Sequence, residues 1–252
     1  MVATRLKSLG NALPVAAALV LLLLAWQFGA AVLDVPTYIL PKPAEILATA
    51  LGRIGFFGGQ LYVTLVEAVG GFLIGSALGI LLAVLMILLP VLEIMLMPLA
   101  MVINAVPSIA FVPLVLLWFG LGMSSKIAIG ALAVVFVVLL NVLSGLKRPD
   151  AEAINLMRSF GASRIGILWR LQLPAGMPSL VTGLRVGLAR STIAVIVAEM
   201  MGAYSGIGQV IYQATAQVDS LTVWAAVFVA SLASLALYGV LVALDRKLVW
   251  WR

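Results

Sequence analysis

Long apolar segments recur along this chain of 252 residues and constrain its fold more than any other feature. Residues 13–33, 62–89, 92–118, 126–146, 180–201 and 222–244 are predominantly apolar. About 20 such residues let a helix cross the hydrocarbon core of a bilayer, about 30 Å thick. Because only helices and closed barrels satisfy their backbone hydrogen bonds in lipid, the pattern predicts an all-α integral membrane protein with about six transmembrane helices. We expect residues 1–252 to form one transmembrane domain.

Composition excludes several classes of function. The chain is 64% hydrophobic and 10% charged, whereas soluble domains are about 45–50% apolar and about 25% charged. It contains no cysteine and no histidine, which excludes thiolate or imidazole metal sites and Ser-His-Asp triads. No G-x-x-x-x-G-K-[ST] run occurs. We therefore predict a non-catalytic chain with no metal or cofactor of its own, and any ATP and Mg²⁺ would be bound by a partner chain.

The net charge of +6 reflects membrane topology better than nucleic-acid binding, since the basic residues do not cluster with aromatic residues in a soluble domain. Cytoplasmic loops of membrane proteins carry an excess of Lys and Arg. With six crossings and both termini inside, only Lys42, Arg53 and Lys126 fall outside. The inside would then hold Arg5, Lys7, Lys147, Arg148, Arg158, Arg164, Arg170, Arg246, Lys247 and Arg252. We therefore expect both termini and residues 147–178 in the cytoplasm.

Residues 147–178 form the only long charged segment between apolar runs. We predict two short helices hinged at Gly161, which supplies the left-handed position that ends the first helix. Asp150 and Ser163 are expected to cap the two helices, and Pro174 to end the second. Each helix has one apolar face, made by Ala153, Leu156, Met157 and Phe160 on the first and by Ile165, Leu168, Trp169 and Gln172 on the second. Such a hairpin either lies on anionic lipid or docks a soluble partner.

Small residues and prolines mark the second and third apolar segments. Gly71, Gly75 and Gly79 form a ladder that lets helix backbones approach closely, within this chain or across a dimer. The third segment contains Pro98, Pro107 and Pro113, and each proline removes a backbone donor, so this helix should be kinked or broken. A broken helix is tolerated where it lines a cavity or packs against protein. We take Asn104, Pro107 and Ser108 as candidate pathway residues.

The fifth apolar segment carries the other candidate pathway residues. Gly183, Gly187 and Ser191 give it one smooth face. An ionisable residue within a membrane span is a functional hypothesis, which here concerns Arg190 and Glu199. These two are nine residues apart, about 13.5 Å along a helix, so they cannot pair within it.

The run Gly161, Ala162, Ser163 and Arg164, followed by Leu173 and Pro174, resembles the EAA loop of binding-protein-dependent ABC importer permeases. Further resemblance lies in residues 38–43, 107–122, 182–185, 198–199, 206–208 and 244–246, which look like the nitrate, sulfonate and taurine branch. One departure is that Asn155, Leu156 and Met157 stand where the family has Glu-Ala-Ala. The resemblance implies ATPase contacts for Asn155, Leu156, Met157, Phe160, Gly161, Ala162, Ser163, Arg164, Leu173 and Pro174.

The resemblance also implies the wider assembly. We expect a MetI-like fold with a cytoplasmic coupling-helix hairpin in a bacterial inner membrane. A second permease subunit, in a homodimer, two P-loop ATPase subunits and an extracytoplasmic solute-binding protein would be its partners, and nucleic acid would not.

Substrate identity is less constrained. The branch moves small anions such as nitrate, sulfonates, taurine or bicarbonate, and Arg190 favours an anion. An aromatic vitamin or precursor is the alternative. An ion-coupled secondary transporter using Glu67 or Glu199 and a passive channel or scaffold are the rival functions, although no inverted repeat is evident.

Overall fold

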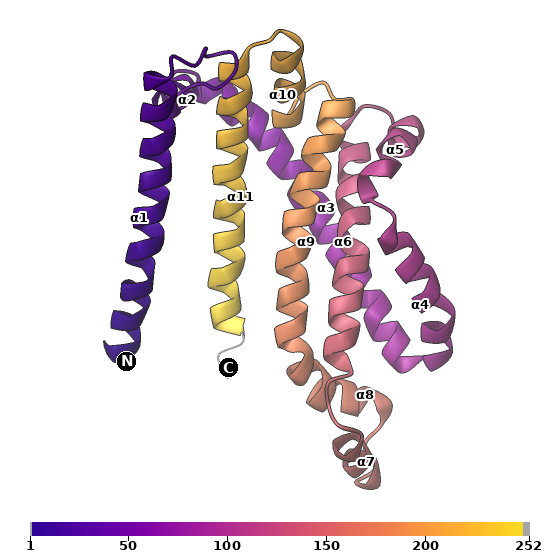
Figure 1. Cartoon of the computed structure of the whole chain (residues 1–252). Coiled ribbons are helices and arrows are strands. Elements are labelled where there is room, and N and C mark those ends of the chain that lie inside the picture. The colour runs from indigo at the N-terminus through magenta and orange to yellow at the C-terminus, as the bar shows by residue number, and fades with distance from the viewer. Residues whose placement is uncertain (1, 249–252) are drawn as a thin grey trace.

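The computed structural model describes residues 2–248, and every regular element in that range is a helix (Figure 1). The helices are α1 (Val2–Val32), α2 (Pro43–Gly52), α3 (Ile54–Leu88), α4 (Pro90–Ala105), η1 (Ser108–Phe111), α5 (Val112–Phe119), α6 (Met123–Leu146), α7 (Ala151–Ser159), α8 (Arg164–Ile167), η2 (Leu168–Gln172), α9 (Leu173–Met201), α10 (Ile207–Ala216) and α11 (Ser220–Leu248).

By length and composition, four stretches of helix can each cross a membrane: Ile54–Leu88, Met123–Leu146, Arg164–Met201 and Ser220–Ala243. Pro90–Ala105 and Ser108–Phe119 make a fifth crossing if they are counted as one bent span. In α1 the described apolar stretch is Ala16–Val32, which is at the short end of the range for a span. The helical membrane fold predicted from the sequence is therefore confirmed.

α7 and α8 project from one end of the bundle, whereas α2, α5 and α10 lie at the other (Figure 1). We call these the hairpin end and the distal end. The first residues of α1 and the last described turns of α11 both point toward the hairpin end. The arrangement agrees with an even number of crossings. Arg252, one of the basic residues assigned to the inside, lies outside the described residues.

The core is a packing of α3, α6 and α9, in which glycines bring the backbones together. A Cβ on Gly71 would lie 2.9 Å from the Cα of Gly130 on α6, and one on Gly75 would lie 2.7 Å from the Cβ of Val134. On α9, a Cβ on Gly183 would lie 2.8 Å from the Cβ of Asn141. The two predicted smooth faces therefore pack within this chain, with α6 between them.

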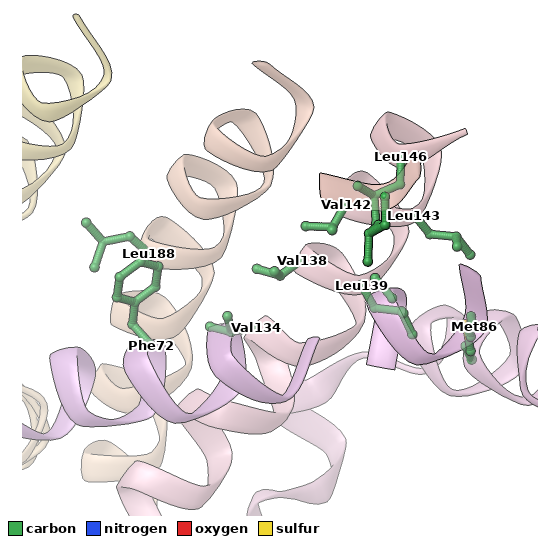
Figure 2. Close-up of a cluster of buried hydrophobic side chains, with 12 residues drawn as sticks. Phe72, Met86, Val134, Val138, Leu139, Val142, Leu143, Leu146 and Leu188 are labelled. Atoms are coloured by element: carbon green, nitrogen blue, oxygen red, sulfur yellow. The ribbon is translucent and has the colours of Figure 1, made fainter. Parts of the chain in front are cut away.

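Apolar side chains fill the remaining space toward the hairpin end. Phe72 and Met86 from α3 and Leu188 from α9 surround a row of α6 side chains (Figure 2). That row runs through Val134, Val138, Leu139, Val142, Leu143 and Leu146, all at most 2% exposed. In contrast, α4 has one buried residue, Ala100, so its faces are left to lipid or to a partner.

The predicted break in the third apolar segment is confirmed at only one of its three prolines. Pro98 lies inside α4 and Pro113 in the first turn of α5, where its missing N–H is harmless. Val106, with φ −77° and ψ 127°, takes the extended conformation that a following proline imposes. The two helical parts meet there at 88°.

The connections at the distal end contain further helices. α3 begins at Ile54, so residues 34–60 are largely helical and include α2. α10 follows Gly206. Lys126, which the charge pattern assigned to the outside, belongs to the first turn of α6 and is fully buried.

We expect Gly75→Ala to destabilise the core. Its methyl group would overlap α6, and overpacking of this kind costs about 1–3 kcal/mol. Gly70→Ala is the matched control on the same helix, because its Cβ would lie 3.5 Å from the Ile127 side chain, an ordinary contact. The melting midpoint of the purified protein should fall only for Gly75→Ala. Equal midpoints for the two variants would contradict this account of the helix contact.

Candidate functional site

A pocket of about 310 Å³ lies where the chain breaks between α4 and α5. One wall is the end of α4 together with η1, and the others come from α6 and α9. Its lining includes Asn104, Pro107, Ser108 and Arg190. Four of the five predicted pathway residues are thus brought together in space, although Arg190 is more than 80 residues from the others in sequence.

Arg190 is the only charged side chain in the lining of this pocket. It is exposed, and it forms no ion pair or hydrogen bond with any residue in the described part of the chain. Asn104 and Ser108, both half-buried, add amide and hydroxyl groups, while Phe111 and Phe136 add aromatic surface. A guanidinium presents five N–H donors in a planar fork, so the pocket can bind an anionic group.

Glu199 does not belong to this pocket. It is 1% exposed and is held by two other helices, α3 and α10: its Oε1 accepts from Thr64 Oγ1 (2.7 Å) and its Oε2 from the Gly208 N–H (2.7 Å). The carboxylate of Glu199 thus has its hydrogen-bond partners inside this chain, unlike the four residues that line the pocket. Among the described residues, no group of three or more His, Cys, Asp or Glu could hold a metal ion.

The second candidate site is the hairpin, which we define as α7, residues 160–163 and α8. α7 ends in a Schellman motif, in which the Gly161 N–H donates to the Arg158 carbonyl (2.9 Å) and the Ala162 N–H to the Met157 carbonyl (3.0 Å). Gly161 has φ +80°, as predicted for the hinge. Ser163 then caps α8, since its Oγ accepts from the Gly166 N–H (3.1 Å). Asp150 occupies the capping position of α7, but its side chain accepts no capping hydrogen bond.

The prediction that Pro174 ends the second helix is wrong. Helix continues from Arg164 to Met201, through the π-helical turn η2 and into α9. The Leu173 N–H donates to the carbonyl of Leu168, five residues back. Proline normally clashes with the carbonyl four residues before it, and the wider π turn relieves that clash. α8 is therefore continuous with α9, the helix that carries Arg190.

Much of the apolar surface of the hairpin is uncovered. No residue of α7 is buried. Leu156 and Phe160 are 58% and 82% exposed, and Ile165 and Trp169 on the following helix are 59% and 64% exposed. Leu168, predicted on the same face, instead packs into the core. Large exposed apolar side chains beside charged ones are typical of a docking surface.

The base of the hairpin is fixed to the core. α6 and α9 meet at Gly145, where a Cβ would lie 2.7 Å from the Cβ of Ser179. Lys147 forms an ion pair with Glu93 on α4, and Arg164 Nη1 donates to the Leu88 carbonyl (3.3 Å) at the end of α3. The hairpin itself contacts the end of α3 through Arg164, and the chain on either side of it leads into α6 and, through η2, into α9. Both α6 and α9 contribute residues to the pocket lining.

The sequence did not predict that four polar residues near the distal end lie together: Gln60, Thr64, Glu67 and Lys126. Gln60, Thr64 and Glu67 lie on one face of α3 at positions i, i+4 and i+7, and they face Glu199 and the start of α10. Lys126 lies near them on α6. A polar stripe of helical period within an apolar segment was the signal that could have identified them.

Residues 75–250 match the family described as binding-protein-dependent transport system inner membrane component. This range covers more than half of the chain. The chain belongs to this family of ABC importer permeases.

Relatives of this permease differ in the solutes they are named for. It is 30% identical to the formylaminopyrimidine transport permease protein ThiX of Halalkalibacterium halodurans, over 92% of this chain and 93% of the relative. It is also 30% identical to the taurine transport system permease protein TauC of Escherichia coli, over 92% and 87% of the two chains. The permease is thus a membrane-spanning transport subunit.

A solved structure supports the fold. An inward-facing crystal form of the MetNI methionine ABC transporter contains a chain that matches this permease with a TM-score of 0.53 and 21% sequence identity. The match covers 75% of this permease and 95% of the MetNI chain. The MetI-like fold expected from the sequence is therefore confirmed.

We expect Ser163→Ala to loosen the first turn of α8, because the Gly166 N–H loses its acceptor. A capping serine contributes about 1 kcal/mol, so the Gly166 amide should exchange with deuterium roughly fivefold faster. Ser159→Ala is the control in the same hairpin, since Ser159 Oγ bonds only to the Leu156 carbonyl (2.7 Å). Unchanged exchange at Gly166 in Ser163→Ala would contradict the cap.

Proposed function

We propose that this permease forms the pathway of an ATP-driven importer for a small anion. The single observation that carries the substrate class is Arg190, the only charge in a pocket that also contains Asn104 and Ser108. An anion lying against Arg190 would replace water with charge-assisted hydrogen bonds. The TauC relative, whose name refers to taurine transport, supports this class.

An aromatic vitamin or precursor is the second candidate. Phe111 and Phe136 in the pocket lining offer surfaces on which a planar ring could stack. The ThiX relative, named for formylaminopyrimidine transport, supports it. Because the two candidates use different groups of the same pocket, substitutions can separate them.

The hairpin is the proposed joint with an ATPase subunit. The exposed apolar side chains of the hairpin, Leu156, Phe160 and Ile165, and Trp169 in the turn that follows, would be buried in a cleft of that partner. This chain has no P-loop, so ATP and Mg²⁺ would bind to the partner. ATP can drive transport only if it favours one arrangement of the pathway over another. The continuation of α8 into α9 would carry that preference to Arg190.

The proposed assembly has two permease subunits, two ATPase subunits and an extracytoplasmic binding protein. The hairpin end and both termini would face the cytoplasm of a bacterial cell, across its inner membrane, and the distal end would meet the binding protein. The basic residues 147, 148, 158, 164 and 170 at the hairpin end support this orientation.

Replacement of Arg190 tests the substrate class. We expect Arg190→Gln to reduce taurine, sulfonate or nitrate uptake by membrane vesicles roughly tenfold or more at low substrate concentration, because a hydrogen bond to a charged group is lost. Uptake should fall less in Arg190→Lys, which keeps the positive charge but not the planar set of guanidinium donors. Radiolabelled uptake is the measurement, with Phe136→Leu as the matched change in the aromatic part. Undiminished anion uptake in Arg190→Gln would contradict the proposal of an anionic substrate. Uptake of an aromatic solute that falls in Phe136→Leu would favour the second candidate.

Replacement of Gly161 tests the joint. Valine is strained at φ +80°, at a cost of about 1–2 kcal/mol or more, whereas asparagine tolerates this conformation. Gly161→Val should therefore lose the co-purifying ATPase and all ATP-driven uptake, while Gly161→Asn should keep both. Mass spectrometry of the affinity-purified complex is the measurement, and Leu156→Glu should also deplete the ATPase. A chain that purifies alone and takes up solute by an ion gradient would overturn the importer proposal.

A further inference from the structure

Three ionisable side chains are buried together near the distal end, away from the pocket. Glu67 of α3, Lys126 of α6 and Glu199 of α9 are 2%, 0% and 1% exposed. Charged groups within a membrane protein are costly unless they are paired and hydrogen-bonded. The ATPase joint and the pocket use none of them, so their retention in the interior calls for a separate physical explanation.

Glu199 and two α3 side chains hold the first turn of α10. The N–H groups of Gly206, Ile207 and Gly208 donate to Gln60 Oε1 (2.7 Å), Thr64 Oγ1 (2.8 Å) and Glu199 Oε2 (2.7 Å) respectively. These N–H groups have no acceptor within a helix, and α10 has no capping side chain of its own. A carboxylate at this position is also favoured by the helix dipole.

The backbone around Glu199 has room for glycine only. A Cβ on Gly206 or on Gly208 would overlap the Glu199 side chain. Gly206 also has φ +111°, which other residues rarely adopt. Gly206 and Gly208, at the start of α10, therefore both lie directly against the Glu199 carboxylate.

The contacts of the two carboxyl groups differ. Glu199 accepts from Thr64 and from Gly208, which suits an ionised carboxylate. Glu67 Oε2 is buried and has no hydrogen-bond partner in the described part of the chain. The carboxyl group that holds an α10 amide is therefore that of Glu199.

Lys126, in the first turn of α6, is buried in the same region, and its Nζ donates to the Leu121 carbonyl. No ion pair joins Lys126 to Glu67 or Glu199 among the described residues. Lys126 is therefore held by the chain just before α6 and not by the α10 contact.

We propose that Glu199 is the positioning residue that locks α10 onto α3 and α9 through its two acceptor oxygens. α9 carries both this lock and the pocket residue Arg190. A partner that contacts α10 would therefore act on the pocket helices through Glu199. This last consequence rests on the proposed function, whereas the lock itself does not.

Two isosteric substitutions test the proposal in the full-length protein. Glu67→Gln changes a carboxyl group that holds no α10 amide, so α10 should stay locked. Glu199→Gln replaces one acceptor oxygen by an NH₂ group that faces a donor, so the Ile207 and Gly208 amides should exchange with deuterium roughly tenfold faster or more. Glu93→Gln, outside the cluster, is a second control.

The outcomes separate the two levels of the proposal. Native protection of α10 in Glu199→Gln would overturn the lock, and an equal loss of protection in Glu67→Gln would overturn its assignment to Glu199. If Glu199→Gln does not accumulate, Gly208→Ala disrupts the same contact with every ionisable group retained, and unchanged exchange there would overturn the lock. ATP-driven uptake by the native complex tests the importer function separately. If no such uptake is found, the importer proposal fails, but the exchange rates of the α10 amides still decide whether the lock exists.

Discussion

Close backbone contact between α6 and its two neighbours is the constraint on which the rest of the permease depends. Lipid provides no hydrophobic drive between helices, so their association relies on packing at short range. Gly71 and Gly75 on one side of α6, and Gly183 on the other, leave no room for a side chain. The apolar row on α6 is thereby enclosed between α3 and α9 (Figure 2). The hairpin, the broken helix and α10 are all attached to this central packing of α3, α6 and α9.

Polar groups are distributed over this frame in two different ways. At the distal end, Glu67, Lys126 and Glu199 are enclosed, and Glu199 accepts from an amide of α10. In the pocket, Arg190 is exposed and has no partner within the described residues. Buried hydrogen bonds such as those of Glu199 stabilise one arrangement of helices. An exposed guanidinium keeps its donors available for a ligand, and this contrast separates the two ionisable residues of α9.

The hairpin and the pocket are connected by helices without an intervening loop. η2 absorbs Pro174, so the helix that starts at Arg164 continues past Arg190. On the other side, Lys147 pairs with Glu93 on α4, whose far end leads to Pro107. Two walls of the pocket are therefore connected to the hairpin end through continuous helix.

The sequence by itself determined the membrane class, the helical segments, the glycine faces, the Gly161 hinge and the break in the third segment, because each follows from apolar length or from local backbone chemistry. It also identified four residues that prove to line one pocket. Only the tertiary structure decided that Pro107 alone breaks the helix, that Pro174 does not, and that Lys126 and Glu199 are enclosed. Those outcomes depend on which helix lies opposite each residue, and contacts between residues as distant as Thr64 and Glu199 leave no local pattern in the sequence.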